Sequence, residues 1–369
     1  MGGSNQDDAS AEQTRVIAMI SGTLPPEACG VGDYTRRLVS ALSKHAVSVC
    51  VFTTIAPDRC LDPELDIRPT VRRWNFLGLP DLLREIVATN PDIVHLQYPT
   101  SAYGAGLLPQ LLVLTRRPFV VTIHEASATN ILYRLALYPF LVLADRVIAT
   151  TTFEADYLVR MYPPVRRRLS VIQIGSNIPS APTRRRERKV VVYFGLIAPH
   201  KCLEDFLRLA RSAQESSEDW EFRIIGKVPH KRQSYADGLR MASRDLRLTW
   251  HLGLSDGQVA DQLAGASAAY LPFPDGASSR RGSLAAALVN GLPTITTHGA
   301  ATPRELVARE NILYADSPEV ALSRIREVFS NISLSRNLSS GAIEYGRNLS
   351  WERIAEQHEA VYDGMARRR

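Results

Sequence analysis

The chain alternates between two kinds of segment along most of its length. Short apolar runs rich in β-branched residues predict strands, and the stretches between them carry apolar residues at helical spacing. Apolar runs without polar alternation are typical of parallel strands that are buried on both faces. These runs cover residues 15–20, 47–53, 92–98, 119–125, 145–151 and 169–175 in the first half, and 189–195, 220–226, 246–253, 267–273 and 292–299 in the second. The pattern predicts two α/β, doubly wound domains.

A change of composition separates the two halves. Residues 176–182 read SNIPSAP and precede the charged run 183–189, so apolar residues give way to Pro, Ser and Arg. Such a stretch is typical of a linker between domains. We therefore expect an amino-terminal domain at 1–180 and a carboxy-terminal domain at 181–349.

The last segment, 350–369, predicts a helix that docks by one face. Ser350 is a suitable N-cap, and apolar residues recur after it at helical spacing. The residues of this face are Trp351, Ile354, Ala355, His358, Val361 and Tyr362.

Composition and charge narrow the class of protein. Of the 369 residues, 45% are hydrophobic and 22% are charged, as in ordinary globular proteins. The 44 Lys and Arg exceed the 38 Asp and Glu by 44 − 38 = 6. The basic residues lie in scattered pairs and triplets rather than in one stripe, which argues against nucleic acid as a partner. An anionic ligand and an acidic membrane surface both stay open.

The cysteines and the chain start bear on the compartment. The four cysteines, Cys29, Cys50, Cys60 and Cys202, form no CxxC pair, so neither a metal site nor a disulfide framework is expected. No stretch matches the ~20 apolar residues of a membrane helix. Residues 1–13 carry acids ahead of the first apolar run, the wrong order for a secretory signal, and we expect a flexible lead-in there. These features favour a cytoplasmic protein.

The first candidate group opens the helix after the strand at 15–20. It contains Gly30 and the candidate acceptor-binding residues Gly32, Asp33 and Tyr34. Glycines at a helix start let backbone N–H groups approach an anion, whereas a purely structural turn is an equal alternative. The spacing differs from that of a dinucleotide-binding fingerprint.

The second group stands at the carboxyl ends of two strands, where ligands of open α/β sheets bind. His124 is the favoured catalytic residue and Glu125 a weaker candidate base, with a buried structural histidine as the alternative. Gln97 and Tyr98 are candidates for lining an acceptor pocket. His95 lies deeper in its strand and is expected to be structural.

Two further groups lie in the second half. Lys201 stands between a glycine turn and a predicted helix, where it would neutralise a diphosphate as a point charge. An arginine pair then leads into an apolar helix and would combine forked donors with free backbone N–H groups. A solvated lysine and a surface charge pair are the alternatives. The residues of this second group are Arg280, Arg281, Gly282, Ser283 and Leu284.

The order and spacing of these motifs along nearly the whole chain resemble those of the GT-B retaining glycosyltransferases of family 4. The segments that carry the resemblance read CGVGDYT, PDIVHLQYP, VVTIHE, ADRVIATT, FGLIAPHKCLEDF, GLPTITT, PRELV and SWERIAEQH. It implies two facing Rossmann-like domains with an inter-domain cleft. The first would bind the acceptor, the second a nucleotide-sugar donor, and the last helix would cross back to the first domain.

The resemblance also implies roles for individual residues. Gly30 would touch the donor phosphate, and His124 would contact the donor sugar near the reacting centre. Lys201 would hold the diphosphate. Gly226 and the turn ending at Leu254 would flank the nucleobase.

The sequence departs from the family pattern at several donor positions. Glu305 matches the acid of the last donor-domain motif, but Leu196 stands where the family has an arginine. Ser278 and Ala286 stand where it has two glutamates that contact the sugar and the ribose. We therefore expect the arginine pair to supply charge, Ser278 to lie at the donor, and the sugar to be unusual.

The expected activity is transfer of a sugar from a UDP-, GDP- or dTDP-sugar, with retention and without a metal or further cofactor. The acceptor would be a small molecule, a lipid or a glycan. Lys201 and Arg281 would stabilise the leaving diphosphate. The alternatives are a GT-B epimerase or pseudo-glycosyl coupling enzyme, and a catalytically inactive nucleotide-sugar-binding homologue. Peripheral membrane contact of the first domain stays open, and so does the oligomeric state.

Overall fold

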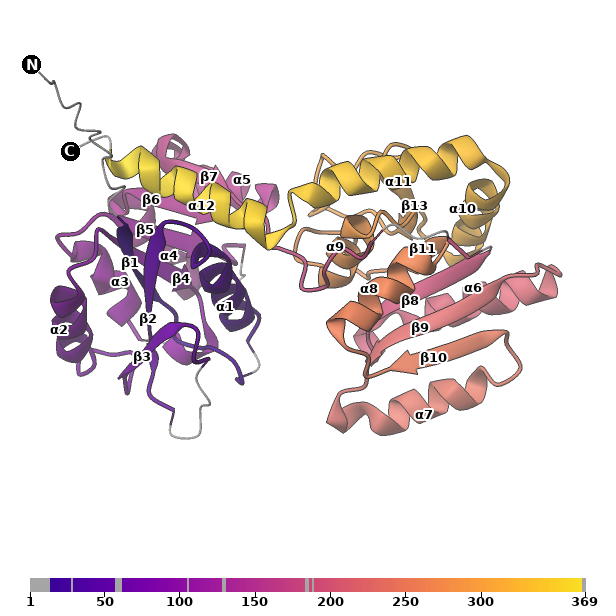
Figure 1. Ribbon diagram of the computed structural model, residues 1–369, viewed down its shortest axis with the longest axis horizontal. Helices are drawn as coiled ribbons and strands as arrows, with labels where there is room; N and C mark the ends of the chain where they lie inside the picture. Colours follow the sequence, from indigo (N-terminus) through magenta and orange to yellow (C-terminus); the bar gives the residue numbers. More distant parts are fainter. Residues whose placement is uncertain are drawn as a thin grey trace, which may run out of the picture. The chain divides into compact units, whose positions relative to one another are not determined.

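The computed structural model describes residues 14–27, 29–56, 62–104, 106–127, 131–182, 186–187 and 189–366 (Figure 1). The lead-in at 1–13 and Cys60 lie outside these residues. The contacts divide the chain into two compact units. The first domain comprises Met1–Ala149, Glu154–Ser170 and Ala355–Arg369, and the second comprises Thr150–Phe153 and Val171–Ile354.

The first domain is built on a seven-stranded sheet in the order β3-β2-β1-β4-β5-β6-β7, with parallel pairing from β3 to β6. Its strands are β1 (Arg15–Ile20), β2 (Val47–Thr54), β3 (Asp66–Val71), β4 (Ile93–Tyr98), β5 (Phe119–Ile123), β6 (Arg146–Ala149) and β7 (Leu169–Val171). Its helices include α1 (Gly30–Leu42), α2 (Leu79–Thr89), α3 (Leu108–Leu111), α4 (Ile131–Leu143) and α5 (Thr152–Met161).

The second domain repeats this architecture with six parallel strands in the order β10-β9-β8-β11-β12-β13. The strands are β8 (Val190–Leu196), β9 (Glu221–Lys227), β10 (Leu248–Leu252), β11 (Ala268–Leu271), β12 (Thr294–Thr296) and β13 (Leu313–Tyr314). The helices are α6 (Leu203–Glu215), α7 (Gln233–Ala242), α8 (Asp256–Gly265), α9 (Gly282–Val289), α10 (Pro318–Ser330) and α11 (Ile332–Arg347).

Strand β8 shows why the second sheet is covered on both faces. Val191 and Tyr193 enter a core with helices α6, α10 and α11, whereas Val190 and Val192 enter another with α8 and α9. Successive residues of a strand point to opposite faces, so a continuous apolar run needs helices on each side. The prediction of two doubly wound α/β domains is confirmed.

The last helix, α12 (Trp351–Ala366), belongs to the first domain from Ala355 onward, whereas Trp351 and Ile354 of the predicted face belong to the second. Ser350 Oγ caps it by accepting a hydrogen bond from the Arg353 amide at 3.2 Å. His358 and Tyr362 are fully buried, and Asp363 pairs with Arg15 at 2.6 Å. Within the described residues, no helix has the length and apolar character needed to cross a membrane.

Candidate active site

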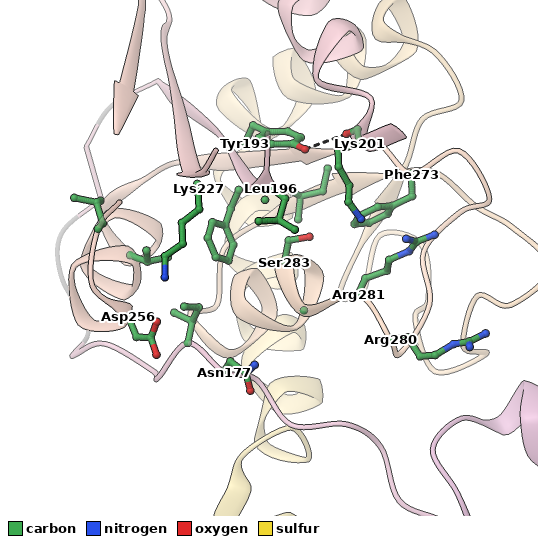
Figure 2. A pocket seen from close by; sticks show the side chains of 18 residues that line it. Asn177, Tyr193, Leu196, Lys201, Lys227, Asp256, Phe273, Arg280, Arg281 and Ser283 are labelled. Carbon is green, nitrogen blue, oxygen red and sulfur yellow. Dashed lines mark hydrogen bonds between the residues drawn. The ribbon is translucent and has the colours of Figure 1, made fainter. Parts of the chain in front are cut away.

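A cavity of about 440 Å³ opens in the second domain at the carboxyl ends of β8 and β9 (Figure 2). The strand order reverses beside β8, and ligands of open α/β sheets bind at such a switch point. The predicted donor residues that line this pocket are Lys201, Gly226, Leu254, Arg280, Arg281, Gly282 and Ser283.

The other predicted donor residues lie elsewhere. Ser278 and Leu284 are buried beside Arg281 but do not line the cavity, and Glu305 is exposed. Gly30 is the exposed first residue of α1 in the first domain.

Lys201 is held at the pocket by the backbone around it. It precedes α6, and the Tyr193 hydroxyl donates a hydrogen bond to its carbonyl oxygen at 3.0 Å. Cys202 follows with a left-handed φ of 53°, which turns the chain into the helix. Among the described residues, the Lys201 ammonium has no ion-pair partner, so its charge is available to a ligand.

Arg281 is already engaged on two sides. It forms an ion pair with Asp275, and its guanidinium lies over the Phe273 ring at 4.8 Å from the centroid. Its buried Nε has no hydrogen-bond partner among the described residues. The ion pair offsets part of its charge, while the ring fixes its position.

Sequence reasoning missed a second lysine in the pocket. Lys227 ends β9 and pairs in register with Leu196, the last residue of β8. The resemblance to family 4 implies an arginine at the position of Leu196. Figure 2 shows Lys201 and Lys227 on either side of Leu196. A cation on the neighbouring strand therefore stands beside the position of the missing one.

The pocket floor requires glycine at Gly226. A Cβ on this residue would lie 2.0 Å from the carbonyl oxygen of Gly195 on β8, which no side chain tolerates. Helix α9 starts at Gly282 with no side-chain cap. The first N–H groups of a helix have no partner within it, so this end of α9 presents donors and a positive dipole to an anion.

Apolar and polar residues that sequence reasoning missed complete the lining. Besides Lys227 and Phe273 they include Asn177, Tyr193, Phe194 and Asp256. Lys227 ends β9 and Phe273 follows β11, so the rule that ligands bind at carboxyl ends would have found these two.

The first domain holds the predicted catalytic histidine in a buried network. His124 Nε2 lies 2.9 Å from Gln97 Oε1, while Gln97 Nε2 lies 3.3 Å from His95 Nε2. The Gln97 amide therefore donates to His95 and accepts from His124 Nε2–H. His95 Nδ1 in turn lies 2.7 Å from the Tyr362 hydroxyl on α12. The network fixes His124 as the tautomer whose Nδ1 can only accept a hydrogen bond.

The structure brings some predicted acceptor residues to His124 and separates others. The Tyr34 ring meets the His124 ring edge-on, with centroids 4.7 Å apart. Tyr98 follows Gln97 in β4 and points to the opposite face, where Gln110 donates to its hydroxyl at 3.1 Å. Glu125 is exposed.

The remaining predicted residues of the first domain lie in α1. A Cβ on Gly32 would lie 2.8 Å from the carbonyl oxygen of Thr23, so packing alone accounts for this glycine. Asp33 is exposed. Loss of hydration beside neighbouring groups still raises the pKa of Asp33, although Arg37 and Arg36 act against the change.

We expect the free energy of unfolding of the first domain to decrease as the pH is lowered below 6.5. Burial, and then the charge of His358, lowers the pKa of His124 from 6.5 to about 3. Below pH 6.5 the unfolded chain therefore gains a proton that the folded chain does not bind. His124 alone removes about 2 kcal/mol of unfolding free energy between pH 7.5 and pH 5.

Urea unfolding at these two pH values measures the loss. His124→Gln should reduce it, whereas the exposed His230→Gln should leave it unchanged. If the unfolding free energies of His124→Gln and of the unaltered chain depended equally on pH, His124 would not be the source of the loss.

Comparisons with known proteins agree with this geometry. Residues 28–178 match the family model described as Glycosyltransferase Family 4. A D-inositol 3-phosphate glycosyltransferase of Actinosynnema mirum is 24% identical, over 96% of this chain and 97% of that protein. That of Thermobispora bispora is 25% identical, over 59% of this chain and only 56% of its own length. The structure of HepE from Anabaena in complex with UDP has a TM-score of 0.70, at 13% identity over 95% of this chain and all of HepE.

The fold of the chain is GT-B, and residues 28–178 resemble glycosyltransferase family 4. At Ser278 and Ala286, where the resemblance implies the family's two glutamates, the chain has no carboxylate. Ala286 lies on α9 and is fully buried in a core of the second domain, and Ser278 is buried as well. A glutamate at 286 would need a partner that this core does not offer. At position 286, burial therefore accounts for a small apolar side chain.

Proposed function

We propose that the chain transfers a sugar from a nucleotide diphosphate sugar to an acceptor, with retention at the anomeric carbon and without a metal ion. The first domain binds the acceptor and the second binds the donor. The observation that carries the proposal is the pocket at the switch point of the second sheet. Its lining includes Lys201, Lys227 and Arg281, together with Gly282 and Ser283 at the start of α9.

These groups suit the leaving diphosphate. When the bond between the anomeric carbon and the diphosphate oxygen breaks, the electron pair stays on that oxygen and negative charge grows there. Two lysines, an arginine and a helix N-terminus are fixed where they stabilise this charge. The acceptor hydroxyl attacks from the same face and gives its proton to the departing diphosphate, which retains the configuration. His124 accepts a hydrogen bond from a hydroxyl of the transferred sugar.

Uridine is the base we propose first. HepE, which has the same fold, binds UDP, and the apolar walls that Phe194 and Leu254 give the pocket suit the face of a base. The relatives named for D-inositol 3-phosphate make a phosphorylated cyclitol the first acceptor to test. A lipid and a glycan complete the acceptor set.

A thermal-shift screen of nucleotide diphosphates and their sugars tests the donor assignment. A bound donor raises the apparent melting temperature by mass action, and we expect the largest shift from a uridine compound. NMR of the product formed with the selected donor then reads its anomeric configuration. An inverted product would contradict the proposed mechanism. Binding of a donor without turnover across the acceptor set would assign the chain to the inactive homologues.

We expect EDTA to leave the transfer rate unchanged, because the pocket's own cations neutralise the diphosphate. Initial rates with and without EDTA, and then with added Mg²⁺, measure the effect. Loss of activity that Mg²⁺ restores would contradict metal independence.

A further inference from the structure

Helix α4 of the first domain exposes an apolar face. Ile131, Leu132 and Leu135 are 63%, 70% and 56% exposed. Tyr138, Val142 and Leu143 are exposed as well, and at 100° per residue the six side chains span an arc of about 140°. We call these six residues the α4 face. It carries no charged residue.

The opposite side of α4 is packed into the domain, so the helix is folded in place while the α4 face stays exposed. Leu137, Phe140 and Leu141 are fully buried and anchor the helix in the core. A surface helix of a globular protein normally places polar residues opposite such an anchor. A contiguous apolar patch in that place marks a surface that binds something.

Neighbouring elements extend the apolar surface. Helix α3 and the turn Leu112–Leu114 both pack against α4. Leu107 and Leu114, at the two ends of this stretch, are themselves exposed.

Basic residues accompany this surface. Residues 106–117, 131–143 and 163–168 together contain six arginines and no acidic residue, a charge equal to the net charge of the whole chain. The third segment lies at the end of α4, because Arg168 donates to the carbonyl oxygens of Leu141 at 2.7 Å and Val142 at 3.2 Å. Of the acids that adjoin α4, Asp145 accepts a hydrogen bond from the Phe119 amide at 2.9 Å, while Glu125 and Asp156 are exposed.

We propose that the α4 face and its arginines form a docking surface for an anionic lipid bilayer. The apolar side chains enter the boundary between headgroups and acyl chains, and the arginines bind lipid phosphates at its edge. Arginine stems lie along apolar surface while their guanidinium groups stay in a polar layer, which suits this geometry.

Charge favours a membrane over a second copy of the chain as the occupant. A symmetric dimer through the α4 face would bring two sets of six arginines together without an acid in these segments to pair with them. An anionic bilayer attracts the same charges. This surface serves any reaction that the chain performs, so the proposal is independent of sugar transfer.

Co-sedimentation of the full chain with vesicles tests the proposal. We expect binding to vesicles of phosphatidylcholine with phosphatidylglycerol, much weaker binding to phosphatidylcholine alone, and weakening by salt. The double variant Leu135→Ser/Val142→Ser should lower the partition coefficient at least about tenfold, because it removes apolar surface from the interface. Arg166→Gln/Arg167→Gln should lower it for anionic vesicles alone.

Matched controls remove the same chemistry elsewhere on the first domain. Val87→Ser changes an exposed apolar residue of α2, and Arg72→Gln/Arg73→Gln removes two exposed charges. Both should bind as the unaltered chain does, and circular dichroism should show every variant folded. Absence of binding to anionic vesicles, or equal loss in the controls, would overturn the proposal. A dimer of the unaltered chain that Leu135→Ser/Val142→Ser dissociates would assign the face to a second copy instead.

Discussion

Lys201→Ala is expected to weaken UDP binding by about tenfold to hundredfold, equivalent to ~1.4–2.8 kcal/mol. The Lys201 ammonium has no protein partner among the described residues, so its whole charge is available to the diphosphate. Arg281→Ala should cost less, because Asp275 already offsets part of its charge. Isothermal titration calorimetry measures the UDP affinity of the unaltered chain and of both variants.

The pair of Leu196 and Lys227 allows a sharper version of this experiment. Lys227→Ala should weaken UDP binding, and the double variant Leu196→Arg/Lys227→Ala should restore it. The two residues are partners on adjacent strands, so the second substitution returns a cation to the neighbouring position. Lys231→Ala, an exposed lysine outside the pocket, is the control. Unchanged affinity in both Lys201→Ala and Lys227→Ala would place the donor elsewhere.

His124→Ala is expected to lower kcat by about a hundredfold or more while UDP affinity changes little. His124 lies in the first domain, whereas every residue of the diphosphate pocket lies in the second. Its hydrogen bond to the sugar would be made chiefly in the transition state, so its loss lowers kcat rather than donor affinity. Initial rates at saturating donor measure the effect.

Gln97→Leu provides a second variant that keeps the imidazole. It removes the acceptor that fixes the His124 tautomer, so we expect an intermediate loss of kcat. Melting curves of both variants show whether they fold. A folded His124→Ala variant with full activity would remove His124 from the site.

Most strands that are buried on both faces could be predicted from the sequence, but β13 (Leu313–Tyr314) was missed because two residues are too few to show a pattern. β3 was missed because Asp66–Val71 is half exposed, includes Pro69 and lies at the edge of the sheet. The predicted strand at 169–175 shrinks to Leu169–Val171. The hydrophobic pattern of a sequence reflects the burial of its side chains, and few side chains of these two segments are buried.

The pocket could be predicted only as far as motifs mark it. Lys227 has no motif of its own, and its place beside Leu196 follows from strand register, which sequence does not display. The ion pair of Arg281 with Asp275 depends on the path of one loop. The separation of Tyr98 from Gln97, in contrast, follows from the alternation of a strand and was open to prediction.

The attachment of α12 to the first domain has a consequence for the order of events on the ribosome. Residues 355–366 are synthesised after the whole of the second domain, yet they supply His358 and Tyr362 to the interior of the first. Until they emerge, His95 lacks its Tyr362 partner and the groove for α12 is open to water. The second domain can therefore finish folding earlier, which reverses the usual amino-terminal-first order of a growing chain.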